Sequence, residues 1–173
     1  MILPYVVPRP QPNRDGGLLA PEFCQTAYVT NDIEKATQVL QMRYDIEAFT
    51  RFDNEMPDGS GTVRIALAWV NDVMLEIIDT DSPNTIFTTK LPANEFAIRH
   101  HHFGYFIEDD AAWDRARDHA KREGLEVVME GDVPDMLRFF YIWSPEFDHY
   151  LEYIQPRETG RQFFASVAGG HGV

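Results

Sequence analysis

The sequence predicts an α+β fold built from two copies of one βαβββ module. Residues 24–32 (CQTAYVTND) align with residues 101–109 (HHFGYFIED), so that Gln25 matches His102 and both segments end in an aspartate. Further along, residues 73–78 (VMLEII) align with residues 149–154 (HYLEYI), which matches Glu76 to Glu152. Between these ends, each copy carries a helical pattern followed by two strand patterns. A repeat of this kind indicates a duplicated half-unit that shares one core.

The first module, residues 21–80, begins with a strand at about 22–30. Its alternation places three side chains on one face: Gln25, Ala27 and Val29. Asn31 and Glu34 then have the spacing of a helix capping box, which predicts a helix from this point. Apolar residues at helical spacing form one stripe along that helix: Ile33, Ala36 and Leu40.

Three more strands complete the first module. They are expected at 46–52, 63–70 and 73–79, and the last two are joined by a two-residue turn at Asn71 and Asp72, which both tolerate positive φ. In the last strand, alternation places three side chains on one face: Met74, Glu76 and Ile78.

A linker at residues 81–97 leads to the second module, residues 98–156. Its first strand is expected to place His102 on one face with His100, Gly104 and Phe106, and His101 on the other face with Phe103. A helix from about 110 carries an apolar stripe and ends near Gly124, and the stripe comprises Trp113, Ala116 and Ala120. Strands are expected at 125–129, 137–143 and 149–154.

Both ends of the chain are expected to lie outside the modules. Residues 1–20 hold four prolines and the pair Gly16-Gly17, which predicts an extended arm. Residues 157–173 have few apolar side chains, which predicts a flexible C-terminal tail.

The bulk composition excludes several classes of partner. The formal charge is −13 and the sequence pI is about 4.7, so we expect no nucleic-acid partner, since phosphate binding requires clustered Lys and Arg. No apolar run reaches the roughly 18 residues of a membrane helix, and the N-terminus lacks the basic start of a signal peptide. The single cysteine, Cys24, fits a reducing compartment. We therefore expect a cytoplasmic protein with no membrane partner.

The repeated positions carry the chemistry. A glutamate inside an apolar strand is costly to bury unless a cation or a hydrogen-bond network compensates it, and Glu76 and Glu152 both occupy such strands. Each could instead face solvent, but the matched repeat favours a shared buried site. With Gln25 and His102, these side chains supply one imidazole nitrogen and three oxygen donors. That set suits Zn²⁺, Ni²⁺, Co²⁺, Mn²⁺ or Fe²⁺ with positions left for two substrate oxygens.

The paired modules and the repeated ligand positions resemble the vicinal oxygen chelate superfamily, which includes glyoxalase I, methylmalonyl-CoA epimerase, extradiol dioxygenases and bleomycin-resistance proteins. The resemblance covers roughly residues 22–156. It is most specific at 25–32, 101–109 and 149–152, which resemble the glyoxalase-like branch close to methylmalonyl-CoA epimerase. It implies a cupped, half-barrel mixed sheet around one metal ion, often in a homodimer. It also implies a metal-ligand set taken one residue from each of four strands: Gln25, Glu76, His102 and Glu152.

Within that superfamily, the donor set is more similar to that of eukaryotic glyoxalase I than to that of the epimerases. Val29 occupies the position of the glutathione-binding arginine of glyoxalase I, so glutathione is not expected. Gln25 replaces the first histidine of the dioxygenases, which disfavours iron-dependent ring cleavage. Basic residues for the phosphates of coenzyme A are scattered: Arg51, Arg64 and Arg99.

The resemblance implies a metal-dependent isomerase, epimerase or lyase that acts on a small carbonyl compound. The metal would chelate a carbonyl and a neighbouring oxygen and stabilise the enediolate formed when the α-proton leaves. Glu152, or else Glu76, would act as the general base. The residues expected to line the substrate pocket are Met74, Ile78, Phe106, Tyr150 and His100, with His149 as a further neighbour. The alternative is a metal-free small-molecule binding protein on the same scaffold.

Overall fold

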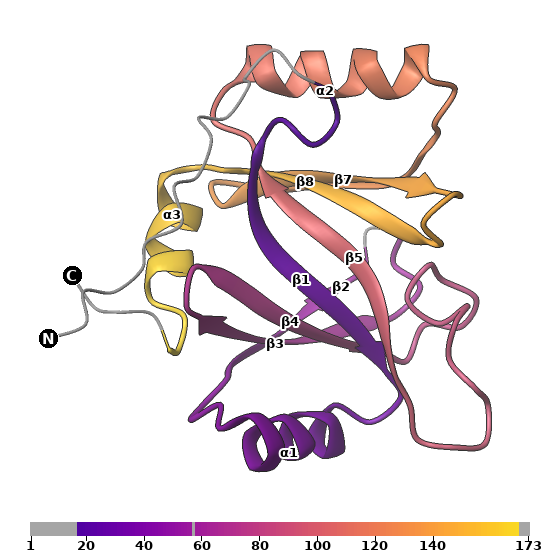
Figure 1. Ribbon diagram of the computed structural model, residues 1–173, viewed down its shortest axis with the longest axis vertical. Coiled ribbons are helices and arrows are strands. Elements are labelled where there is room, and N and C mark those ends of the chain that lie inside the picture. Colours follow the sequence, from indigo (N-terminus) through magenta and orange to yellow (C-terminus); the bar gives the residue numbers. More distant parts are fainter. Residues whose placement is uncertain (1–16, 57, 170–173) are drawn as a thin grey trace, which may run out of the picture.

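In the part of the chain that the structure describes, eight strands form one sheet. The structure is a computed structural model, and it describes residues 17–56 and 58–169. Most of the expected N-terminal arm, residues 1–16, lies outside this described part. The strand order is β2-β3-β4-β1-β5-β8-β7-β6, so the first strands of the two modules lie side by side at the centre (Figure 1).

The predicted fold class is confirmed, because each half of the chain is one βαβββ unit. The first unit contains β1 (Glu22–Thr30), α1 (Ile33–Tyr44), β2 (Thr50–Glu55), β3 (Thr62–Val70) and β4 (Val73–Thr80). The second contains β5 (Ile98–Phe106), α2 (Asp110–Arg122), β6 (Val127–Val133), β7 (Leu137–Ser144) and β8 (His149–Pro156).

The pairing of the strands curls the sheet into a half-barrel. β1 runs parallel to β4 and β5 runs parallel to β8, whereas β1 and β5 are antiparallel to each other. Figure 1 shows α1 and α2 on opposite outer sides of the curled sheet. Each helix buries its predicted apolar stripe against its own unit, α1 through Ile33 and Ala36 and α2 through Trp113, Ala116 and Ala120.

The start of α1 differs from the prediction by one residue. Asp32 is the N-cap, and its carboxylate accepts a hydrogen bond from the Lys35 backbone amide at 2.9 Å. Asn31 instead ties β1 to the linker, since its side chain donates to the Glu95 carbonyl at 2.7 Å and accepts from the Ala97 amide at 3.1 Å. The capping-box assignment of Asn31 is therefore wrong, because a tertiary contact uses its side chain.

Two strands lie later in the chain than predicted. β2 begins at Thr50 rather than 46, because Ile46 and Phe49 pack against the cluster under α1 instead of joining the sheet. β6 begins at Val127 rather than 125, because the Leu125 amide bonds to the Ala120 carbonyl at the end of α2. In both cases, apolar residues of a loop that packs on a helix resemble a strand in sequence.

The two predicted turn signals are present. Val70 pairs with Val73 across the hairpin between β3 and β4, and Asn71 has a φ of 56°. Gly124 follows α2 with a φ of 72°, the left-handed conformation that often ends a helix.

The C-terminal segment contradicts the predicted flexible tail. Residues Glu158–Ala165 form α3, which places Phe164 and Val167 in a core cluster with Met74 and Ile154. Its backbone is tied to β3, since Trp69 Nε1 donates to the Phe164 carbonyl at 2.9 Å and the Trp69 amide donates to the Ala168 carbonyl at 2.8 Å. A few apolar residues at helical spacing are enough to hold α3 in place, because the sheet already provides the apolar surface that they cover.

Replacing Trp69 by phenylalanine should weaken the attachment of α3. The substitution removes the indole donor and leaves the Phe164 carbonyl with only the longer, 3.3 Å bond from the Val167 amide, which costs about 1 kcal/mol in the free energy of unfolding. Urea unfolding would measure this loss. Ala165→Ser, an exposed change on the same helix, should alter the value by less than about 0.5 kcal/mol.

Candidate metal centre

The strand register brings the repeated side chains into one place. β1 sets Ala27 beside Glu76 of β4, and β5 sets Gly104 beside Glu152 of β8. Where β1 crosses β5, Gln25 lies opposite Gly104 and Ala27 lies opposite His102. Each candidate ligand of a central strand therefore faces a small residue of the other, which leaves room for four long side chains. The four that meet are Gln25, Glu76, His102 and Glu152.

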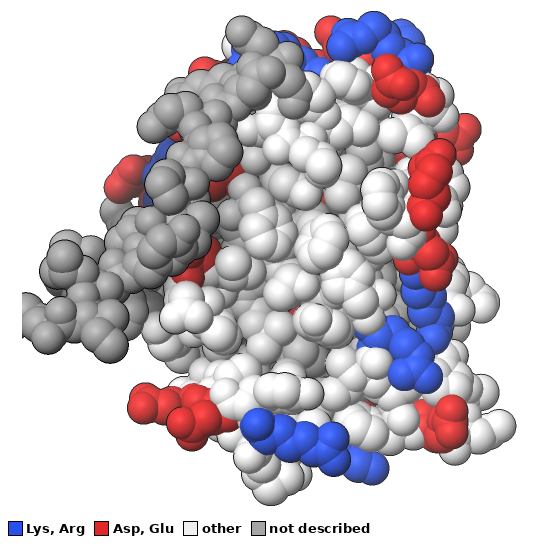
Figure 2. All heavy atoms as spheres, in the orientation of Figure 1, with Lys and Arg blue, Asp and Glu red and all other residues white. Residues whose placement is uncertain are grey.

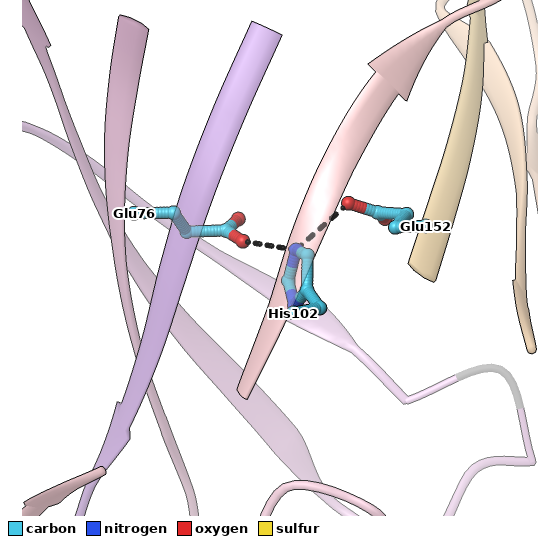
Figure 3. Close-up of side chains that lie close together, drawn as sticks. All are labelled: Glu76, His102 and Glu152. Atoms are coloured by element: carbon cyan, nitrogen blue, oxygen red, sulfur yellow. Dashed lines mark ion pairs between the residues drawn. The ribbon is translucent and has the colours of Figure 1, made fainter. Parts of the chain in front are cut away.

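The other three side chains converge on the imidazole of His102. Its Nε2 lies 3.0 Å from Glu152 Oε2, 3.3 Å from Glu76 Oε2 and 3.4 Å from the Gln25 amide nitrogen. The Gln25 amide also donates a hydrogen bond to Glu76. Figure 3 shows the two carboxylates approaching His102 from opposite sides. All four residues are buried, and His102 has no exposed surface.

The donor set and its spacing fit a divalent metal ion. Ligand atoms of Glu76, His102 and Glu152 all lie within 4.8 Å of one another. Two atoms that bind one ion at roughly 2.1 Å and at right angles are about 3 Å apart, close to the two distances from His102 Nε2. A flip of the Gln25 amide group by about 180° would turn its carbonyl oxygen toward the metal position, since the amide nitrogen and oxygen have nearly the same shape. Carboxylates, imidazole and amide oxygen together suit the borderline or hard divalent ions.

Without a metal ion, the buried charges compensate one another. Burial alone would lower the pKa of His102, but the carboxylates of Glu152 and Glu76 raise it to about 9. Burial raises the pKa of Glu76, although His102 opposes this shift. A protonated His102 between two glutamates is thus the favoured state when no metal is bound near neutral pH.

A β-bulge in β5 overturns the predicted faces of two histidines. Ala27 pairs with His102 and Tyr28 pairs with His100, so His101 is an extra residue in β5. His101 therefore lies on the inner side with His102, and its ring packs on Tyr150 at 4.7 Å. His100 lies on the outer side against the rings of Tyr28, Phe103 and His149. The expectation that His100 shares a pocket with His102 is wrong, since simple alternation does not anticipate the inserted residue.

The other predicted pocket residues lie on the inner side but are packed into the core. Ile78 and Tyr150 belong to one apolar cluster, and Met74 and Phe106 belong to or pack against another. A cavity of about 720 Å³ lies elsewhere, between α2 and the start of β1, and is lined by residues such as Leu19, Phe23 and Arg115. None of the four candidate ligands lines this cavity, so we assign it no part in the chemistry.

Sequence reasoning missed two residues at the site. Tyr141 of β7 lies opposite Glu152, hydrogen-bonds its carboxylate and packs 5.1 Å from the His102 ring. Burial raises its pKa well above the usual value, so it stays a phenol that can donate. His101 is the second. No sequence signal pointed to Tyr141, because the repeat places Leu67 at the matching position beside Glu76.

Gly104 is required for the position of Gln25. A Cβ added at residue 104 would lie 2.8 Å from Gln25 Cβ, closer than such atoms approach in proteins. Gly104→Ala should therefore displace the Gln25 side chain and weaken Zn²⁺ binding about tenfold, as when a group that orients a ligand is lost. Competition with a chromogenic chelator measures the affinity. Ala27→Gly, the matching position in the other unit, adds no contact and should bind Zn²⁺ like the wild type.

Comparison with known proteins shows the fold and leaves the activity open. No protein-family model matches the sequence, and no curated protein is detectably similar to it. Methylmalonyl-CoA epimerase from Mycobacterium tuberculosis superposes with a TM-score of 0.60 at 13% identity, over 87% of this chain and 95% of that one. A methylmalonyl-CoA epimerase in complex with methylmalonyl-CoA and NH4+ gives 0.58 at 15% identity, over 80% and 96%. A hypothetical protein from Bacillus halodurans gives 0.58 at 11% identity, over 80% and 96%. These likenesses show that the chain shares the glyoxalase-like fold of these proteins.

Proposed function

We propose that the protein is a metal-dependent isomerase, epimerase or lyase that removes a proton next to a metal-chelated carbonyl. The observation that carries the proposal is the convergence of Gln25, Glu76 and Glu152 on His102, in a fold that other proteins use for such reactions. These four side chains would hold the ion, whose charge would draw electrons from the substrate oxygens and make the neighbouring C–H more acidic.

The protein's own groups would then move the proton. We assign Glu152 as the general base, because Tyr141 hydrogen-bonds its carboxylate and so fixes its orientation beside the site. Glu76 is the second candidate, since burial raises its pKa toward the range in which a base works near neutral pH. The same carboxyl group would return the proton to the original or the neighbouring carbon.

A metal-free binding protein is the second candidate function. It is favoured by one observation: both carboxylates already have protein partners, Glu76 in Gln25 and His102, and Glu152 in His102 and Tyr141. A site satisfied in this way needs no ion to remain buried. In this case the space inside the curled sheet would bind a small molecule without catalysing a reaction.

Metal analysis combined with isotope exchange separates the two candidates. Protein purified without chelators should contain about one divalent ion per chain, which identifies the metal. α-Hydroxycarbonyl compounds and acyl thioesters incubated with it in D₂O should gain deuterium at the α-carbon, and removal of the metal should stop the gain. Exchange that persists in metal-free protein, or no exchange in any compound of either class, would contradict the proposed reaction.

The arginines of the chain bear on whether the substrate carries phosphate groups, as coenzyme A does. The three arginines considered for phosphate binding already have partners: Arg51 is paired with Glu34, Arg64 with Asp79 and Asp81, and Arg99 donates to the Ile98 carbonyl beside it. The phosphates of a coenzyme A substrate would thus compete with these carboxylates for Arg51 and Arg64. Small uncharged carbonyl compounds are the first class to test.

We also propose a homodimer in which the outer sides of β1 and β5 meet. Rings in contact form a strip across this side, from exposed Phe23 through Phe103 and His149 to exposed Phe147. Figure 2 shows that the surface between the two outer helices is largely uncharged, with charged side chains around its rim. Copies of a chain with charge −13 repel each other least through such a face. Light scattering should give twice the chain mass, and Phe147→Glu should give the monomer mass.

A cytoplasmic location completes the proposal. Within the described residues, no helix is long and apolar enough to span a bilayer. Cys24 is buried and unpaired, which agrees with a reducing compartment. Fractionation of cells that produce the protein tests this location.

A further inference from the structure

The bulge in β5 places two adjacent histidines on the same side of the sheet. In a regular strand their rings would point to opposite sides, but His101 and His102 contact each other edge to face with ring centres 5.1 Å apart. Both side chains are fully buried. His101 is enclosed by the rings of Phe87, Tyr141 and Tyr150. Its place in the structure is therefore fixed from several directions.

Hydrogen bonds connect the two rings to the linker. His101 Nε2 lies 3.1 Å from the Ile86 carbonyl oxygen, and His101 Nδ1 lies 2.8 Å from His102 Nδ1. A carbonyl oxygen only accepts, so His101 Nε2 must carry a proton. The ring is fully buried among aromatic side chains, and a neutral imidazole that has its one proton on Nε2 has a lone pair on Nδ1.

The remaining proton follows from this chain. Because His101 Nδ1 accepts, His102 Nδ1 must donate across the 2.8 Å contact. A neutral His102 then carries its only ring proton on Nδ1, and its Nε2 is the free nitrogen. That nitrogen is the one that faces Glu152 and Glu76.

We propose that His101 is a positioning residue that holds His102 in the tautomer whose Nε2 can bind a divalent metal ion, with the Ile86 carbonyl as the anchor of the chain. The inference rests on the proposed metal site and adds a residue that touches neither the ion nor the substrate. Partners of this kind orient a ligating histidine and strengthen its binding. Here the partner is the next residue of the same strand, which is possible only because of the bulge.

Two substitutions of His101 distinguish a role as hydrogen-bond acceptor for His102 from a role in packing alone. His101→Phe keeps an aromatic ring among its neighbours but removes both nitrogens, so Zn²⁺ affinity should fall about 10- to 100-fold. His101→Asn loses the ring but keeps an oxygen near the position of Nδ1, so affinity should stay within about threefold of the wild type. If His101 only filled space, the order would reverse, and the phenylalanine variant would bind better than the asparagine variant.

Nitrogen NMR of the wild type tests the tautomer without relying on any variant or on activity. In ¹⁵N-labelled, Zn²⁺-loaded protein, His102 should show a protonated Nδ1 and a metal-bound Nε2, and His101 should show a protonated Nε2 and a bare Nδ1. Metal bound through His102 Nδ1, or a protonated His101 Nδ1, would overturn the inference. Zn²⁺ binding with the expected tautomers but no exchange in any substrate would instead contradict the proposed function alone. Wild type that binds no Zn²⁺ would overturn both.

Discussion

In the Glu152→Gln protein, solvent exchange of the substrate α-proton should fall by about 10³-fold, while the fold remains intact. Glutamine keeps the shape of glutamate and can still accept from Tyr141, but it cannot take up a proton. The rate of deuterium incorporation at saturating substrate, divided by the metal content of each sample, measures the chemical step separately from metal loss.

The controls for this experiment come from the same chain. Glu146→Gln is an exposed change that should leave the rate unaltered. Glu76→Gln addresses the second candidate: if it abolishes exchange while Glu152→Gln retains it, Glu76 is the base and Glu152 only a ligand. Exchange retained in both variants would remove the carboxylates from the chemistry.

The stability of the metal-free protein should decrease as pH rises from about 6.5 to about 9. His102 has its ordinary pKa of about 6.5 when unfolded and a pKa of about 9 when folded, so in this range the folded state binds more protons. The stabilisation is complete below pH 6.5 and is lost as pH passes through about 9. One pKa unit corresponds to about 1.4 kcal/mol, so the loss is about 3 kcal/mol. The raised pKa of Glu76 adds a change of the same sign at lower pH.

A divalent ion should reverse this dependence, because it replaces the proton on His102 Nε2. The rise in Tm on adding Zn²⁺ should consequently be larger at pH 8.5 than at pH 6, as calorimetry in the presence and absence of chelator would show. His102→Gln should flatten the pH profile between 6.5 and 9 and remove the Zn²⁺ effect. A wild-type profile already flat in this range would mean that His102 is not held protonated by the two glutamates.

Specific residues show how much of the site the sequence could predict. The repeat aligns Gln25 with His102 and Glu76 with Glu152, and the duplicated register then places all four together, because matching strands pair in matching ways. The sequence also indicates that Ala27 and Gly104 leave space beside the ligands, since each small residue lies two positions after a candidate ligand. Parallel pairing of β1 with β4 and of β5 with β8 converts these sequence relations into proximity.

The sequence by itself determined the two βαβββ units, the buried stripes of α1 and α2, and the four side chains at the centre. The tertiary structure decided what local periodicity does not encode. The bulge at His101 depends on how β5 pairs with β1. The ordered position of α3 depends on a surface supplied by β3. The contact of Tyr141 with Glu152 depends on β7 lying next to β8. Periodic patterns record which face of an element is apolar, whereas an inserted residue or a partner from a distant strand is selected by packing free energy after the elements have met.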